Sequence, residues 1–341
     1  MKKSLFILLI PLFLFGMAAC HQPRPSTQQT QMLFRSGHYP HAFFWNGTYY
    51  YTMQPDGNDI TLYATRDLSL LPQSQHKVVW SADSLGFQHF WSPEIHRING
   101  RWYIYFEADD GNTDNHQLYV IENTGDDPMQ GTWQLRGPLQ TNEDWNFGIH
   151  PNVLSVGGEL YLFWSGWPKR RVEHETQCIY IARLSDPWTV ASERVMLSRP
   201  EYEWERQWIN PDGSRSAYPI YVNENPQALL SPDGRHVHLY YSASGIWTRY
   251  HVLGALSAPA NANLLDPGVW TKAPEPVLVD TAVYGASNIC VVPDTVSSSD
   301  ASRALLLYDA LWMEDGHEQR SVFLKTISWT DDGQPVFCQP T

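Results

Sequence analysis

One pattern of strand, glycine turn and strand recurs along the chain and constrains its fold more than any other feature. The clearest copies are "FFWNGTYYYT" (43–52), "HRINGRWYIYF" (96–106), "VLSVGGELYLFWSGW" (153–167) and "LLSPDGRHVHLYYSAS" (229–244). Each copy turns at a glycine and continues with alternating aromatic and aliphatic residues, which is typical of a β-hairpin. After the N-terminal apolar run, no stretch has sustained helical periodicity, so the sequence predicts an all-β chain.

A fifth, degenerate copy runs from "NICVVPD" (288–294) to "RALLLYDALW" (303–312), with a serine-rich insert at its turn. The copies are separated by about fifty to seventy-five residues, which is too long for WD40-type blades but natural for four-stranded blades with variable outer loops. We therefore expect a single five-bladed β-propeller over residues 33–341.

Compact turns of polar and aromatic residues precede four of these hairpins: "GHYP" (37–40), "FWSPEI" (90–95), "FGIHP" (147–151) and "VNENP" (222–226). The innermost strand of each propeller blade begins near the central axis. Turns that are far apart in sequence are therefore expected to meet in one axial pocket, where a few polar groups converge.

The N-terminus has the features of an export signal. Lys2 and Lys3 precede an apolar run over residues 5–15, and "GMAAC" follows, which resembles a bacterial lipobox. We expect a lipoprotein signal peptide over residues 1–19 and a lipid on Cys20; the alternative is an ordinary signal peptide with a chance cysteine. Residues 20–32 then form a flexible tether. The protein would be lipid-anchored in the bacterial cell envelope, periplasmic or on the surface, with no other membrane contact.

Charge and cysteine content exclude several partners. The net charge is −13, or about −15 without Lys2 and Lys3, and there is no basic run, so nucleic acid is not an expected partner. The three remaining cysteines, Cys178, Cys290 and Cys338, show no CxxC spacing, which argues against a disulfide framework or a zinc site and leaves room for one bridge. Fifteen Trp and eighteen Tyr suit either sugar stacking or a large β core.

Several segments together resemble glycoside hydrolase family 43, in the branch that acts on arabinofuranosyl ends of plant polysaccharides. They are "FWSPEIHRINGRWYIYFEADDG", "FGIHPNVLSVGGELYLFWSGWP", "SRPEYEWER", "VNENPQALLSPDGRHVHLYYSAS" and "LLDPGVWTKAPEPVL". The similarity runs in order from about residue 33 to 340. It implies a five-bladed propeller, an inverting mechanism, and an oligosaccharide or polysaccharide ligand held by a monomer without a cofactor.

The resemblance assigns three catalytic positions. The general acid of the family is a Glu in a segment like "VNEGPQ", and Glu224 of "VNENPQ" matches it. The general base is an Asp in an Asp-Pro pair, which is Tyr39-Pro40 here, and an Asp that tunes the acid falls on His150 of "GIHPNV". Two of the three carboxylates are thus replaced. A histidine that often helps to hold a central metal ion falls on Ser287, so we predict no metal there.

Three accounts follow from these replacements. The chain binds glycans without cleaving them, as the loss of base, tuner and metal ligand together suggests. Alternatively, Tyr39 is a nucleophile assisted by Glu224, with His38, His41 or His150 as acid or base, since sialidases use a tyrosine in this way. Thirdly, a carboxylate from a nearby loop replaces the base. The candidates are Asp109, Asp110 and Asp144, although such clusters are commonly solvated turns.

The same mapping predicts substrate-binding residues near the axial turns: His38, His41, Phe90, Trp91, Trp145, Phe147, Trp167, Trp247 and Tyr284. We expect about half of the aromatic residues to contact a sugar ring and the others to belong to the blade core, because buried Trp and Tyr are common in β proteins. Glu94 is expected to be a structural hydrogen-bonding residue. A propeller that binds only another protein stays possible if side chains such as Tyr39 block the pocket.

Overall fold

The computed structural model describes residues 30–54, 57–81, 85–141, 147–169, 176–207, 221–278, 283–295, 303–314, 317–330 and 333–337. Strands dominate this part of the chain, which confirms the predicted all-β class. Its helical segments are short 3-10 turns: η1 (Leu68–Gln73), η3 (Thr113–Asn115), η4 (Glu203–Glu205) and η5 (Pro267–Val269). None of these described helices has the length and apolar character needed to cross a membrane. The predicted signal peptide lies outside the described residues.

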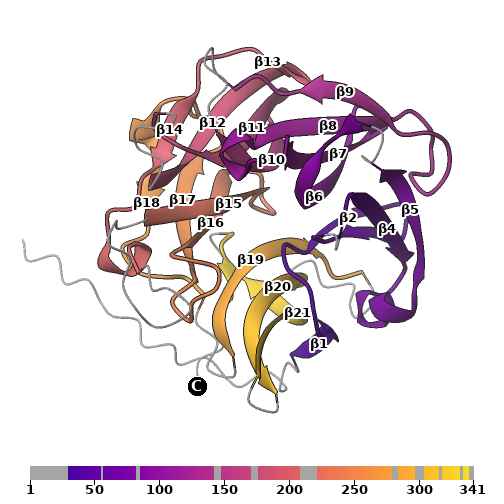
Figure 1. Cartoon of the computed structure of the whole chain (residues 1–341). Coiled ribbons are helices and arrows are strands. Elements are labelled where there is room, and N and C mark those ends of the chain that lie inside the picture. The colour runs from indigo at the N-terminus through magenta and orange to yellow at the C-terminus, as the bar shows by residue number, and fades with distance from the viewer. Residues whose placement is uncertain are drawn as a thin grey trace, which may run out of the picture.

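In the described chain, the strands form four sheets. The largest sheet consists of two antiparallel groups joined by a short parallel pairing of β12 (Thr176–Asp186) with β15 (Tyr221–Leu230), so that five successive groups surround a common centre (Figure 1). The first group is β2 (His41–Trp45), β3 (Thr48–Thr52), β4 (Asp59–Thr65) and β5 (Gln75–Ser81). The second group is β6 (Gln88–Ile98), β7 (Arg101–Asp109), β8 (Gln117–Asn123) and β9 (Gln134–Pro138). The third group is β10 (Gly148–Val156), β11 (Glu159–Gly166) and β12 (Thr176–Asp186), with β13 (Thr189–Val190) and β14 (Val195–Ser198).

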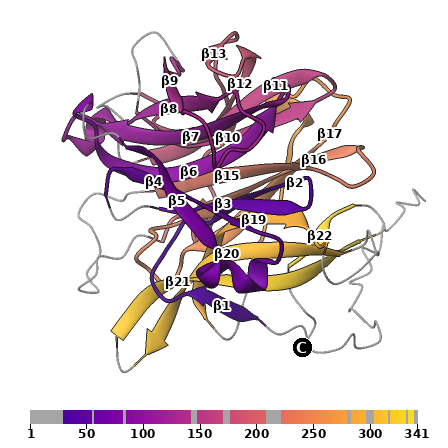
Figure 2. The same ribbon diagram turned by 90° about the vertical axis from the view of Figure 1, so that its right-hand side faces the viewer.

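The fourth group is β15 (Tyr221–Leu230), β16 (His236–Ala243), β17 (Val252–Pro259) and β18 (Thr271–Lys272). The fifth group is β19 (Tyr284–Pro293), β20 (Arg303–Glu314), β21 (His317–Trp329) and β22 (Pro335–Val336), together with β1 (Gln31–Phe34). The N-terminal strand β1 pairs with β21 and lies along it in the side view (Figure 2). The first described strand therefore begins at Gln31, so the last two residues of the predicted tether, 31 and 32, belong to the fold.

Glycine turns form the hairpins that the repeats predicted. At the first three copies, both central turn residues have positive φ: Asn46-Gly47 (48° and 78°), Asn99-Gly100 (49° and 82°) and Gly157-Gly158 (60° and 87°). Two-residue turns with positive φ at both positions match the twist of the strands that they join, and Asn and Gly tolerate this conformation. The insert of the fifth copy lies mainly outside the described residues.

The strand interiors explain the alternation of aromatic and aliphatic residues. Along β7, Trp102, Ile104 and Phe106 enter the hydrophobic cluster shared with the first group, whereas Tyr103 and Tyr105 enter the cluster shared with the third. Because successive side chains of a strand point to opposite faces, an inner strand packed on both faces is apolar throughout. Much of the aromatic content therefore forms core.

Five large hydrophobic clusters of described residues each join two neighbouring groups. Four of them join successive groups along the chain. The fifth combines Leu33 of β1 and Tyr49 of β3 with Leu307 of β20, and so packs the last group against the first. Cys178 and Cys290 are buried in different clusters, so no disulfide joins these two.

Candidate active site

Each group has a residue in the left-handed backbone region just before its first strand or within the first half of that strand. These residues are Tyr39 (φ 53°), Ser92 (36°), His150 (56°), Asn225 (49°) and Asn288 (48°). Non-glycine residues in this region cost on the order of 1–3 kcal/mol each and are retained where the surroundings fix them. In four groups a proline follows, and the next residue returns to the strand. The four turns that the sequence singled out, and a fifth at Asn288, thus have equivalent positions.

His150 is the centre of the polar contacts between these turns. Its ring lies 4.6 Å from the ring of Tyr39, measured between centroids. Its Nδ1 is 2.5 Å from Ser92 Oγ, and its Nε2 is 3.7 Å from Glu224 Oε2. The structure therefore brings together the three residues that the sequence predicted as catalytic, Glu224, Tyr39 and His150.

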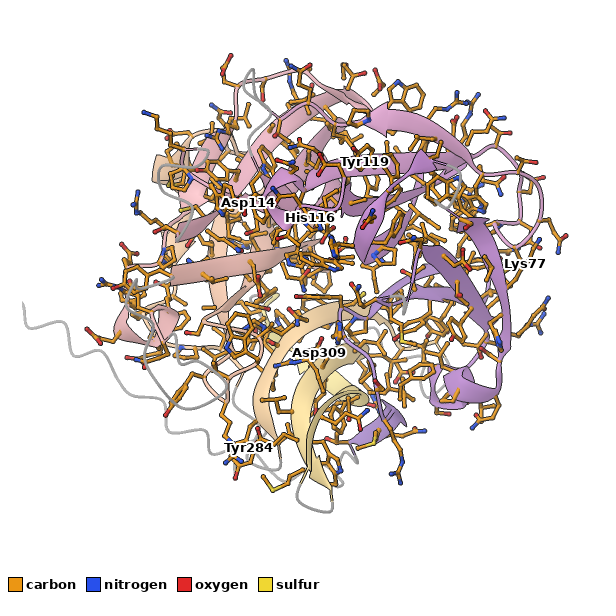
Figure 3. All side chains as sticks on the ribbon, viewed as in Figure 1. Lys77, Asp114, His116, Tyr119, Tyr284 and Asp309 are labelled. Atoms are coloured by element: carbon orange, nitrogen blue, oxygen red, sulfur yellow. The ribbon has the colours of Figure 1, made fainter. Side chains whose placement is uncertain are left out.

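The opposite side of the site is held by amides and an ion pair. Asn225 donates to Asn288 Oδ1 (3.0 Å), and Asn288 in turn donates to both carboxylate oxygens of Asp309 (3.1 and 3.0 Å). Asp309 also accepts the backbone N–H of Tyr39 at 2.8 Å and pairs with Arg320. This network fixes the backbone of Tyr39 and uses the carboxylate of Asp309 in structural hydrogen bonds. Asp309 lies near the centre of the molecule in Figure 3.

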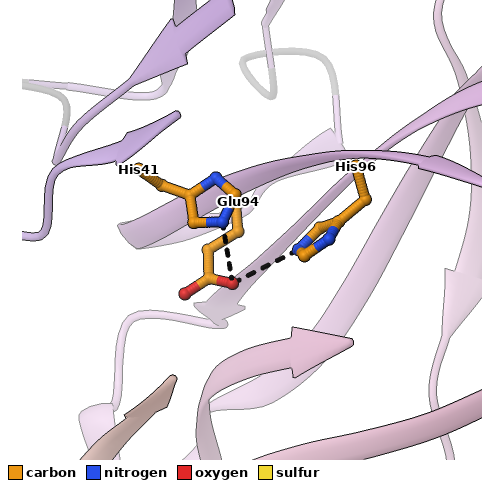
Figure 4. A group of neighbouring side chains, drawn as sticks. All are labelled: His41, Glu94 and His96. Carbon is orange, nitrogen blue, oxygen red and sulfur yellow. Dashed lines mark hydrogen bonds and ion pairs between the residues drawn. The ribbon is translucent and has the colours of Figure 1, made fainter. Parts of the chain in front are cut away.

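A second layer of polar side chains is formed by residues two positions further along the same strands. Glu94 accepts hydrogen bonds from Gln227 and from Asn152 (2.8 Å), and it lies 3.3 Å from His96 Nε2 and 3.7 Å from His41 Nε2 (Figure 4). Burial opposes ionisation of Glu94, but His41 and His96 lower its pKa overall. Glu94 thus has the structural role that the sequence predicted.

His41, Glu94 and His96 are the residues in the described chain whose donor atoms lie close enough together to bind one metal ion. Their surroundings fit a hydrogen-bonded cluster better. A metal at Nε2 of His41 would place the proton on Nδ1, and this buried nitrogen has no acceptor among the described residues; histidine ligands ordinarily donate from the other nitrogen. Burial also lowers the pKa of His41 to about 4, so the ring is neutral at pH 7.

The metal position that the resemblance implies does not fit either. The hydroxyl of Ser287 is buried and lies 3.4 Å from the carbonyl of Gly285. A hydroxyl engaged with a backbone carbonyl does not replace an imidazole ligand. We therefore assign no step of the chemistry to a metal ion.

Burial and charge set the protonation of the central groups. Burial, followed by the negative charges of Glu224 and Asp309, raises the pKa of Tyr39 well above its usual value. Burial raises the pKa of Glu107 to about 7, although His150 and Ser92 act in the opposite direction. Burial also disfavours a charged His150, but Glu107 and then Glu224 raise the pKa of its imidazole overall. Tyr39 is consequently a poor base at neutral pH.

Three of the predicted aromatic residues pack in a small cluster with Ile149, the residue before His150. Phe147 stacks on Trp167 with their centroids 4.2 Å apart, and Trp91 stacks on His116 at 4.0 Å while packing against the same small cluster. Phe90, by contrast, is 2 % exposed and stacks on Phe106 inside the core between the first and second groups. The prediction that Phe90 binds substrate is therefore corrected. Trp145 lies outside the described residues.

Other predicted binding residues lie further from the centre. Trp247 and Tyr284 are 43 % and 49 % exposed, and Tyr284 lies under the guanidinium of Arg249 and towards the edge of the molecule in Figure 3. His38 contacts the edge of the Tyr39 ring. His41 belongs to the buried second layer, which places it below the residues that a ligand would contact first.

Asp109 and Asp110, two of the three alternative carboxylates, bind residues other than Glu224. Asp109 is buried and binds His89 (2.9 Å) and the backbone N–H of Gly111 (2.7 Å), whereas Asp110 accepts from Asn115 in an exposed turn. Asp144 lies outside the described residues. Sequence reasoning missed Ser92, Glu107 and Asp309; of these, Ser92 alone carried a signal, because it precedes a proline as Tyr39 and His150 do.

An all-β chain whose sheets surround a buried acid and imidazole is a β-propeller-type protein. More specifically, the chain belongs to the glycosyl hydrolases family 43, whose family model matches residues 35–335. The chain is 31% identical over 305 residues to an extracellular exo-alpha-(1->5)-L-arabinofuranosidase of Streptomyces chartreusis, covering 86% of this chain and 85% of that one.

Two further comparisons agree with this family. The chain is 30% identical to alpha-L-arabinofuranosidase 43 of Humicola insolens, over 95% of this chain and 66% of that longer protein. It is also similar to the crystal structure of an alpha-L-arabinofuranosidase from Lactobacillus brevis, with a TM-score of 0.77, 28% identity and coverage of 91% of this chain and 95% of that one.

Proposed function

We propose that residues 33–341 form one closed five-bladed β-propeller and that its axial site hydrolyses arabinose-containing glycans. The closed ring is supported by the hydrophobic cluster between the last and the first strand group and by the pairing of β1 with β21. The activity is supported by the family and by the arabinofuranosidase relatives. The observation that carries the proposal is the position of Glu224 beside His150 and Tyr39 at the axial turns.

Glu224 is the general acid in this proposal. Its carboxyl group is 9 % exposed, lies in the strand that enters from the axis, and faces an imidazole. It donates its proton to the glycosidic oxygen while water attacks the anomeric carbon, so that the glycosidic bond breaks and one sugar unit leaves. The attacking water loses a proton to solvent, and Glu224 takes up a proton from solvent before the next turnover. General acid catalysis of this kind contributes typically about 10²- to 10⁴-fold to the rate.

A second function has to be considered because no described residue is well suited to activate water. Tyr39 occupies the base position, but its raised pKa opposes both a base and a phenolate nucleophile. Glu94, Glu107 and Asp309 are buried and hold other side chains. This arrangement favours, as the second candidate, a glycan-binding propeller that has lost turnover.

Export completes the proposal. The lipobox-like "GMAAC" and the description of the Streptomyces chartreusis relative as extracellular support an exported chain. We propose that it is a monomer anchored by a lipid on Cys20, which places the site in the cell envelope where plant glycans arrive.

Release of arabinose from α-1,5-linked arabino-oligosaccharides tests the function, with calorimetry of the same ligands alongside. An enzyme releases the monosaccharide, and Glu224→Gln removes that activity while ligand binding persists. Binding without turnover by the wild-type chain would establish the second candidate. If the wild-type chain shows neither turnover nor binding, both candidate functions are refuted.

A further inference from the structure

A second buried carboxyl group lies on the far side of His150 from Glu224. Glu107, in the middle of β7, is fully buried, and its Oε1 is 3.4 Å from His150 Nδ1. Ser92 links the two groups, because its hydroxyl donates to Glu107 Oε1 at 2.7 Å and lies 2.5 Å from the same nitrogen. Since a hydroxyl has one proton to donate, Nδ1 must be the donor to Ser92. The imidazole is therefore held between two carboxyl groups, with its Nε2 facing Glu224.

The charge at position 150 matters for an acid at Glu224. A neighbouring carboxylate helps a carboxylic acid to keep its proton, whereas an isolated imidazolium would favour the ionised form. His150 stands where the resemblance places a tuning Asp, so the substitution alone would reverse the electrostatic effect on Glu224. Glu107, Glu224 and a neutral His150 that together hold one added proton carry a net charge of −1. A pair of carboxyl groups, one at position 150 and one at Glu224, that share one proton carries the same net charge.

We propose that Glu107 is a positioning residue for Glu224, supplying through His150 the negative charge that a carboxylate at position 150 would supply. The inference rests on the proposed function. Above the pKa of Glu107, where this carboxyl group is ionised, the shared proton of the resting site lies between His150 Nε2 and Glu224 Oε2. When Glu224 gives its proton to the leaving oxygen, the remaining charge on the pair is stabilised by the same imidazole.

A purely structural role for Glu107 explains less of the geometry. Hydrogen bonds from the Ser92 hydroxyl and from the backbone N–H of His150 favour the ionised form of Glu107, but its Oε2 is buried without a hydrogen-bond partner among the described residues. Burial of a carboxyl group without full compensation is unfavourable, and a neutral side chain would bind Ser92 as well. The raised pKa values of both Glu107 and His150 agree with a shared proton. The other charged and titratable groups that act on this pair are Glu94 from β6, Tyr39, and Glu224 from β15.

The titration of His150 tests this coupling without any need for turnover. We would follow the imidazole nitrogens of ¹⁵N-histidine-labelled protein by NMR, with the His150 signals assigned from His150→Asn. In the wild type, His150 should keep its proton above the ordinary pKa of histidine, and Glu107→Gln should lower that pKa by about one unit or more. Glu159→Gln, a half-exposed glutamate on β11, is the matched control and should leave His150 unchanged.

Unchanged titration of His150 in Glu107→Gln would overturn the proposal. If Glu107→Gln does not fold, Glu107→Asp can be used, because it moves the carboxyl group away from His150 by one methylene. Glu107→Asp should lower the pKa of His150 by a smaller amount, and an unchanged pKa of His150 in that variant would also overturn the proposal. The NMR titration needs no substrate, so it tests the coupling of Glu107 to His150 independently of activity. Absence of hydrolysis would refute the proposed function and leave this test unaffected.

Kinetics then distinguish positioning from stability. In an active enzyme, Glu107→Gln should move the alkaline limb of the kcat/KM profile down by about one pH unit. The double variant Glu107→Gln with His150→Asp returns a carboxylate to position 150 and should restore the limb. An unshifted limb in the single variant contradicts the proposed role.

Discussion

Replacement of Glu107 by Gln should make the stability of the fold less dependent on pH. Burial raises the pKa of Glu107 from an ordinary 4.5 to about 7. The folded state therefore binds a proton that the unfolded state has lost, and stability falls as pH rises from about 4.5 through 7. Each pKa unit corresponds to about 1.4 kcal/mol, so the rise from 4.5 to about 7 lets this carboxyl group contribute at most about 3.5 kcal/mol to the fall.

The partner histidine acts in the same direction. The pKa of His150 is also raised in the folded state, so the stabilisation from its protonated form is present at low pH and is lost as pH rises through the folded value. Glu107→Gln removes the carboxyl titration and weakens that of the imidazole. The wild type should thus lose more of its free energy of unfolding between pH 5 and pH 8 than the variant does.

Urea unfolding followed by tryptophan fluorescence at pH 5, 6, 7 and 8 measures the difference. We expect the wild-type and Glu107→Gln curves to converge or cross as pH rises, with a change in their separation of about 1–3 kcal/mol. Glu159→Gln should run parallel to the wild type. A constant separation between wild type and Glu107→Gln would show that Glu107 takes up no proton between pH 5 and pH 8, and the reasoning from its raised pKa would be refuted.

Three further predictions concern other parts of the site. Tyr39→Phe should change kcat less than about tenfold, because a phenol with a raised pKa is neither base nor nucleophile; a loss of 10²-fold or more in steady-state assays would restore the covalent route. Arg320→Leu should destabilise the fold by about 3–5 kcal/mol in urea titrations, since it leaves the buried Asp309 unpaired, and a loss below 1 kcal/mol would contradict this. Incubation with EDTA should leave activity and unfolding midpoint unchanged, because Ser287 and the hydrogen-bonded His41–Glu94–His96 cluster do not form a metal site; loss of activity reversed by a divalent ion would show the opposite.

The sequence predicted the hairpins well because their signals are local. A glycine turn and alternating side chains act over about ten residues, and the turn residues Asn46 and Asn99 adopt the expected left-handed conformation. The turns around Tyr39, Ser92, His150 and Asn225 were also predictable, since each precedes a proline at the start of an inner strand.

It was less predictable which face of the strand each side chain near those turns would occupy. Strand β6 changes register twice, between Gln88 and Trp91 and again between Trp91 and Glu94. Each irregularity breaks the period of two, so the faces of Phe90 and Trp91 could not be counted along the strand: Phe90 enters the core, and Trp91 packs against the small cluster around Phe147. Glu107 was missed for a different reason: it lies within an apolar strand, and of its two partners Ser92 comes from the neighbouring strand β6 and His150 from another sheet.

The leaving-group dependence of Glu224→Ala tests the central claim, that this side chain is a general acid at the axis of a family 43 hydrolase. An α-1,5-linked arabinobiose needs a proton on its leaving oxygen, whereas a 2,4-dinitrophenyl arabinofuranoside does not. We predict that the variant loses about 10²- to 10⁴-fold on the disaccharide and less than about tenfold on the activated glycoside. An equal loss on both substrates, or wild-type activity on both, would contradict the assignment.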